Sequence, residues 1–178
     1  MIYRFLRTLV LYIGLFSMAS TALAAIPRFQ AGEKKRGEYV RNGVILGGEA
    51  RKAFSFQDLR WAYGAKKGIE RLIFEFGDEK GQAINTRPGY FQVNVDPSNK
   101  VVQVEFSQIV GSRVDQKSLV RKLKSSPHIE RVKMTYDPED RGLSLQLYLK
   151  NHVGVEVFEL PAKKKGGRLA LDLKRVKI

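Results

Sequence analysis

The sequence predicts an all-β domain with one short helix, built as a small β-sandwich or partly open barrel of short antiparallel strands. Three observations carry this prediction. From Phe54 onward, apolar and polar residues alternate in eight short segments, which is the period of a strand with one buried and one wet face. Turn-forming residues such as Pro, Gly, Asn and Asp separate these segments. A single segment has helical spacing instead.

Four expected strands precede the helix. In the second of them, Leu72, Phe74 and Phe76 share one face. The sequence Pro-Ser-Asn-Lys at 97–100 is turn chemistry, so the third and fourth strands are expected to form a hairpin. These strands are Phe54–Ala62, Ile69–Phe76, Tyr90–Asp96 and Val101–Phe106.

The expected helix, Gln116–Leu123, interrupts the alternation. Asp115 can cap its N-terminus, and Pro127 prevents its continuation. Leu119 and Leu123 share its apolar face. Four more strands follow, of which the second alternates most regularly. They are Ile129–Tyr136, Leu143–Lys150, Val153–Leu160 and Arg168–Val176.

The first 24 residues have the pattern of a secretory signal peptide. Arg4 and Arg7 precede the apolar run Thr8–Ser17, and small residues place the cleavage site between Ala24 and Ala25. The alternative is an uncleaved anchor, but this run is shorter than the about 20 residues that span a bilayer. We therefore expect export to the periplasm of a Gram-negative bacterium, with no stable membrane span after cleavage.

Residues 25–53 are expected to form a flexible basic linker, followed by the β-domain at 54–178. This segment combines Lys34-Lys35-Arg36 with scattered glycines, and only Val44–Leu46 is apolar. So little apolar surface cannot offset the entropy lost on ordering. The alternative is a basic arm that lies on an anionic surface.

Charge restricts the partners. The chain has 32 Lys and Arg against 18 Asp and Glu, a net charge of +14, and loss of the two signal arginines leaves +12. A cytosolic protein this basic would suggest nucleic acid, which an exported protein is not expected to meet. The polyanions of the envelope are lipid phosphates, lipopolysaccharide and the carboxylates of peptidoglycan peptides. We expect peptidoglycan or another such polymer as the partner.

The residues that usually carry catalysis or metal binding form no recognisable pattern. His128 and His152 have no second histidine or carboxylate at ligand spacing. Three acids fall within Asp137–Asp140, but a calcium loop there would have Arg141 at a ligand position, so a hairpin turn is the simpler interpretation. The chain has no cysteine, which excludes thiolate chemistry. We expect no catalytic residue, metal or cofactor.

Acidic residues of the strands are expected at outward, solvated positions. A pair of catalytic carboxylates, as in glycosidases, needs two acids with different surroundings in one cleft. No acid of this chain is marked by its sequence as deeply buried. The outward acids are Glu75, Glu105, Glu156 and Asp172.

Basic and aromatic residues at outward strand positions are the remaining surface signal. Arginine offers a two-pronged donor to carboxylate or phosphate, and tyrosine can pack against a sugar ring. The alternative is an ordinary solvated sheet face. The candidate ligand-binding residues are Arg71, Arg131, Lys133, Tyr148 and Lys150.

Several strand sequences resemble the AMIN domain, from about Phe54 to Val176. Its early signature, a short run ending in Arg before an alternating strand, is similar to 68–76, with Arg71 at the motif position. Its following hairpin resembles 88–93 with 99–104, and its closing hairpin resembles 153–160 with 167–173. The resemblance implies a small β-sandwich that binds cell-wall material and positions envelope proteins. No amidase or secretin sequence follows here, so it implies a stand-alone, non-catalytic domain.

Three functions follow in order of preference. The first is a non-catalytic periplasmic domain that binds peptidoglycan or another anionic envelope polymer. The second is a structural or adaptor subunit of a pilus, secretion or division complex, which could recruit its partner by edge-strand pairing. The third is an enzyme, which would require a pocket that holds His128 or His152 beside a carboxylate.

Overall fold

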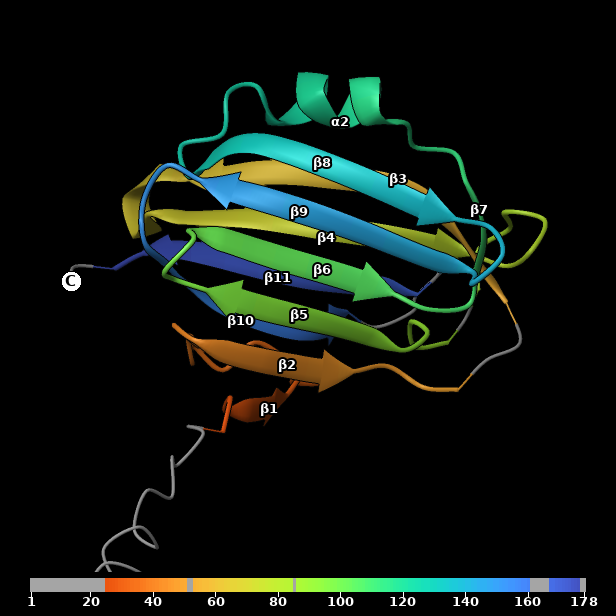
Figure 1. The fold of residues 1–178 in the computed structure, drawn as a ribbon, viewed down its shortest axis with the longest axis horizontal. Helices are drawn as coiled ribbons and strands as arrows, with labels where there is room; N and C mark the ends of the chain where they lie inside the picture. Colours follow the sequence, from red (N-terminus) through yellow and green to blue (C-terminus); the bar gives the residue numbers. More distant parts are fainter. Residues whose placement is uncertain (1–24, 51–52, 85, 161–166, 177–178) are drawn as a thin grey trace, which may run out of the picture.

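Two β-sheets pack face to face with one helix at an edge (Figure 1). The computed structural model describes residues 25–50, 53–84, 86–160 and 167–176. The described strands do not close into a barrel, so the expected all-β sandwich is confirmed. The predicted signal peptide, residues 1–24, lies outside the described residues. Among the helices that the structure describes, none is long and apolar enough to cross a membrane.

The first sheet has six strands in the order β1-β2-β5-β6-β9-β8. Neighbours are antiparallel except β1 and β2, which run parallel. The strands are β1 (Arg28–Gln30), β2 (Gly43–Gly47), β5 (Phe91–Asp96), β6 (Val101–Phe106), β8 (Ile129–Asp137) and β9 (Gly142–Leu149).

The second sheet has five strands in the order β10-β11-β4-β3-β7. Here β7 runs parallel to β3, so both sheets are mixed, whereas the alternation predicted antiparallel strands throughout. A 3₁₀ turn, Ala65–Lys67, joins β3 to β4. The strands are β3 (Phe54–Gly64), β4 (Ile69–Gly77), β7 (Ile109–Ser112), β10 (Val153–Leu160) and β11 (Arg168–Arg175).

All eight expected strands are present, and the expected helix is α2 (Gln116–Leu123). The Asp115 carboxylate accepts a hydrogen bond from the Ser118 N–H at 2.7 Å, which confirms the predicted cap. Leu119 and Leu123 face the core. Strand β7 was not expected, because four residues are too few to show alternation.

The segment expected to be a flexible linker contributes two strands. β2 pairs with β5 over five residues, and Ile45 is only 2% exposed. Residues 31–40, which we call the strap, cross to the other sheet, where Gly32 and Val40 exchange backbone hydrogen bonds with β10. The structure therefore differs from the linker prediction. The open edges of the two sheets supply hydrogen-bond partners that the local sequence does not reveal.

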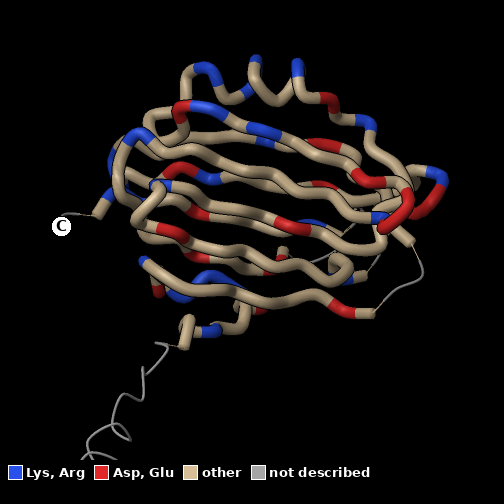
Figure 2. The backbone as a smooth tube through the Cα atoms, in the orientation of Figure 1, with Lys and Arg blue, Asp and Glu red and all other residues tan. Residues whose placement is uncertain are grey.

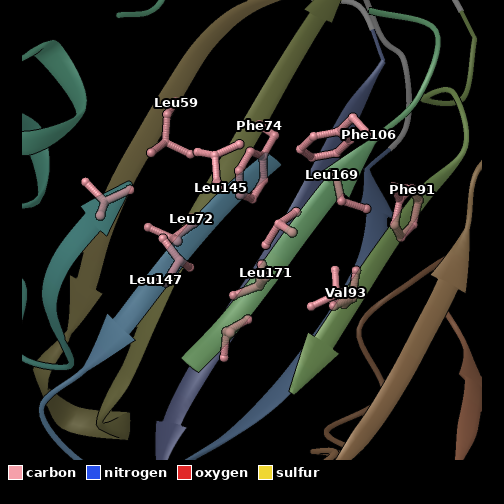
Figure 3. Packing of buried hydrophobic residues seen from close by; sticks show 14 of the residues in the cluster. Leu59, Leu72, Phe74, Phe91, Val93, Phe106, Leu145, Leu147, Leu169 and Leu171 are labelled. Atoms are coloured by element: carbon pink, nitrogen blue, oxygen red, sulfur yellow. The ribbon is translucent and has the colours of Figure 1, made fainter. Parts of the chain in front are cut away.

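Inward side chains of both sheets form one core (Figure 3). Phe74 of β4 and Phe106 of β6 meet across it with ring centroids 5.3 Å apart, and Phe91 lies 6.5 Å from Phe106. Leu145 and Leu171 come from opposite sheets and are fully buried. Each such side chain contributes about 1.5–3 kcal/mol on burial, so the core can support the fold without disulfides.

Both long edge strands of the sandwich are partly covered. On β8, the Gln116 amide donates to the Val132 carbonyl and accepts from the Met134 N–H, each at 2.7 Å. The strap covers β10, and the other edge strands, β1 and β7, have three and four residues. An uncovered long edge is what strand addition by a partner requires. The described edges therefore offer little room for it.

Candidate ligand-binding surface

Arg131 and Tyr148 form the centre of the predicted site. They are register partners on β8 and β9, and the guanidinium lies 3.8 Å from the centroid of the Tyr148 ring. The Tyr148 hydroxyl donates to the Gln146 amide oxygen at 3.0 Å, which fixes the ring. Lys133 occupies the next outward position, opposite Gln146. A stacked guanidinium keeps its N–H edge free for an acceptor.

Lys150 lies just beyond the end of β9, on the same side of the sandwich. Its Nζ donates to the Ser126 carbonyl at 2.7 Å, and its backbone N–H donates to the His128 carbonyl. It therefore ties the end of β9 to the loop before β8. The residue remains exposed, so its charge adds to that of the neighbouring strand.

Helix α2 extends this positive region beyond the sheet. Lys117, Arg121 and Lys124 recur at helical spacing around Val120, which is 49% exposed, while Leu119 and Leu123 turn inward. Figure 2 shows Lys and Arg along α2 and β8. The span 115–136 holds six basic and two acidic residues, a net charge of +4. We define the basic surface as Lys117, Arg121, Lys124, Arg131, Lys133, Tyr148 and Lys150.

Arg71 lies elsewhere, on the outward side of the five-stranded sheet. Its guanidinium forms a two-pronged ion pair with Asp172 and lies 5.1 Å from the Phe158 ring centroid. Lys35 of the strap also contacts the Asp172 carboxylate. Burial opposes ionisation of Asp172, but hydrogen bonds and charge from Arg71 and Lys35 outweigh it and lower the Asp172 pKa. Four of the five predicted residues therefore gather on one side, and Arg71 does not join them.

The outward positions of Asp172 and Glu156 are buried, although solvated positions were expected. The strap covers them: Glu156 accepts the Arg36 and Gly37 N–H groups at 2.6 Å each and lies 3.4 Å from the Lys35 Nζ. Gly37 has a φ of +84°, which favours glycine there. Strand parity placed these acids on the outward face correctly, but it could not reveal a segment that lies over that face.

His128 is buried at one end of the sandwich, 4% exposed, with its ring edge-on to Tyr63. The fully buried Glu70 carboxylate accepts hydrogen bonds from the His128 backbone N–H and from the Trp61 indole. Neither hollow described for this chain is lined by a histidine. Within the described residues, no group of three or more His, Asp or Glu side chains is placed to hold a metal ion.

A surface groove of about 520 Å³ opens at the other end of the six-stranded sheet. Tyr90, Gln92 and Glu105 line it together with apolar and glycine positions of β2, β6 and β9. The amino-acid sequence gives no sign of this groove. Its residues alternate like those of any half-solvated strand, and only the 51% exposure of Tyr90 distinguishes them.

Comparison with known proteins does not assign the chain to a family. No family model matches the chain, and no curated protein matches it.

Proposed function

We propose that this chain is a non-catalytic binding protein of the bacterial envelope, exported to the periplasm, and that its basic surface holds an anionic polymer such as peptidoglycan. The observation that carries the proposal is the stack of Arg131 on Tyr148, at 3.8 Å, beside Lys133 and continuous with the cations of α2. The AMIN resemblance supports the same role.

The arrangement suits repeated carboxylates rather than one small anion. Arg131 is held flat by the Tyr148 ring, so its outer N–H groups can take a carboxylate with little loss of side-chain freedom. The remaining cations stand along β8, along α2 with its C-cap, and just beyond β9, each exposed to water. Single contacts of this kind are weak, at about 0–1 kcal/mol. Many of them in a row give useful affinity for a polymer.

An adaptor role through strand addition receives less support. α2 occupies two outer backbone groups near the middle of β8, and the strap occupies those of Val155, Val157 and Glu159 on β10. A protein partner would therefore have to bind side chains on the sheet faces. Crosslinking in cells that recovers one defined protein, together with no binding to cell-wall sacculi, would favour this second role.

A pull-down with purified sacculi tests the proposal. The protein is expected to be retained at low salt and released as sodium chloride is raised, because exposed charge contacts are screened. The double variant Arg131→Glu with Lys133→Glu is expected to bind about tenfold more weakly or worse, because two contacts become repulsions.

Arg28→Glu is the matched control, since Arg28 lies on β1 at the opposite edge of the same sheet. It makes the same change of charge as either single substitution on β8, Arg131→Glu or Lys133→Glu, and is expected to alter retention much less. Absence of salt-sensitive retention would refute the proposal. So would an equal loss from Arg28→Glu and from either substitution on β8.

A further inference from the structure

The groove at the far end of the six-stranded sheet differs in charge from the basic surface. Glu105 of β6 lies in it, and the hairpin that follows β8 brings Asp137, Glu139 and Asp140 to the same end. The same hairpin also carries Arg141, so the groove lining and this hairpin together hold four acids and one base. A phosphate or carboxylate ligand would meet repulsion there.

The Glu105 carboxylate is held in place by neutral groups. One oxygen accepts from the Gln103 amide at 2.6 Å and the other from the Gln92 amide at 3.4 Å. The ion pairs described for this chain do not include Glu105. A carboxylate has about four acceptor sites, so two donors leave it able to accept a further, charged donor.

The rest of the groove is suited to an aliphatic stem beside an aromatic ring. Leu46, Phe91 and Phe106 contribute apolar lining, and Tyr90 stands on the rim with half of its surface exposed. Gly142 also lines the groove, and a β-carbon there would meet no atom within 4 Å. A side chain introduced at this lining position would therefore not clash with the protein.

We propose that this groove binds a primary alkylammonium group. The ammonium of the ligand contacts the Glu105 carboxylate and the Tyr90 ring, and the methylene stem of the ligand lies along Leu46. A carboxylate and an aromatic face together select a cation over a neutral group of the same size. Transfer of each methylene from water to an apolar site is favourable by about 0.8 kcal/mol. The stem therefore adds to the binding free energy that the charge provides. A free diamine and a lysine side chain share this chemistry. The inference is independent of polymer binding at the basic surface.

Titration of the purified protein at neutral pH, followed by calorimetry or NMR, tests the inference with three probes. These are 1,5-diaminopentane, Nα-acetyl-lysine amide and the uncharged analogue 1,5-pentanediol. Both amines are expected to bind and the diol to bind at least tenfold more weakly, because it lacks the charge. Tighter binding of the acetyl-lysine amide would indicate that the natural ligand is a lysine side chain of a peptide. Tighter binding of the diamine would indicate that it is a free polyamine.

Three variants locate the binding. Glu105→Gln removes the charge and keeps the shape, so amine affinity is expected to fall about tenfold or more. Gly142→Leu adds bulk at a lining position where the protein leaves room for a side chain, and is expected to weaken amine binding. Glu139→Gln removes a charge from the neighbouring hairpin, outside the groove lining, and is expected to change affinity less than about twofold.

Circular dichroism and a melting curve establish that each variant is folded before it is titrated. Equal binding of diol and amine, unchanged amine binding in folded Glu105→Gln, or no binding of either amine would overturn the inference. None of these results would affect retention on sacculi. Loss of sacculus binding would in turn leave the amine titration unchanged, so the two proposals fail separately.

Discussion

Arg71 and Asp172 are register partners on β4 and β11, and their side chains meet in a two-pronged ion pair. The Nε–Oδ1 distance is 2.6 Å and the Nη2–Oδ2 distance is 2.8 Å. The Asp172 side chain is fully buried, whereas that of Arg71 keeps 36% exposure. Removal of the cation therefore leaves a carboxylate without its main partner inside the protein. Removal of the anion leaves a cation that can turn toward water.

This asymmetry predicts unequal effects of substitution on stability. Arg71→Met keeps most of the side-chain volume, and we expect it to lower the free energy of unfolding by about 2–3 kcal/mol, since Lys35 still contacts Asp172. Asp172→Asn keeps the volume of the acid and is expected to cost about 1 kcal/mol. Urea unfolding followed by circular dichroism measures both. A larger loss from Asp172→Asn than from Arg71→Met would contradict this account of the pair.

The lowered pKa of Asp172 predicts that the pair stabilises the fold less in acid. Its folded pKa lies below the ordinary value of 3.8, so the unfolded chain binds the proton more readily. The stabilisation is therefore fully present above about pH 4–5 and is lost as pH falls through the folded pKa. Urea unfolding of the wild type and of Asp172→Asn from about pH 6 to about pH 2 measures the difference between them.

The difference in the free energy of unfolding between the wild type and Asp172→Asn is expected to become smaller as the pH falls. Asp96 and Asp115 also have lowered pKa values, from hydrogen bonds with Asn99 and Ser118, but they are present in both proteins and cancel in the comparison. A difference that stays constant down to the lowest pH would mean that Asp172 does not change its proton affinity on folding.

The strap is expected to open locally when Glu156 is removed. Its carboxylate accepts two strap N–H groups, and charge-assisted hydrogen bonds of this kind contribute about 1.5–3 kcal/mol each. In Glu156→Ala, hydrogen exchange at the Val40 amide, which donates to Val155 at 2.8 Å, should accelerate at least about tenfold. The amide of the core residue Val104 should change far less. Equal acceleration at both amides would show that the strap opens only when the whole domain unfolds.

The alternation of apolar and polar residues was sufficient to predict the eight long strands, because it marks an inward and an outward side chain in turn along each strand. It did not find β1 and β2, whose few apolar residues stand among glycines and charges. Those strands depend on the edge of β5, which is a tertiary contact. Strand β10 is buried on nearly its whole length, because the strap lies over its outward side, so its acids are not solvated.

In the candidate site, too, the sequence pattern predicts the local arrangement within a hairpin but not the contacts between distant elements. Arg131 and Tyr148 could be placed together from sequence, since a hairpin turn sets the register of β8 and β9. Lys117, Arg121 and Lys124 were not assigned to the site, because helix docking is not encoded in the strand pattern. Arg71 was assigned to it and lies on the other sheet, because alternation gives the face of a strand but not the sheet that it joins.

Gln116 is expected to protect the edge of β8 from self-association. Its amide takes the place of a neighbouring strand, donating to Val132 and accepting from Met134. In Gln116→Ala those two backbone groups lose their partner, and we expect a loss of about 1–3 kcal/mol in stability together with concentration-dependent oligomers. Gln116→Glu is the matched variant, since its carboxylate still accepts from Met134 but cannot donate to Val132, and it should fall between the wild type and the alanine variant in stability. Sedimentation velocity over a range of concentrations measures the oligomers. If Gln116→Ala stays monomeric at every concentration while its stability falls, the packing of α2 protects the edge without help from this amide.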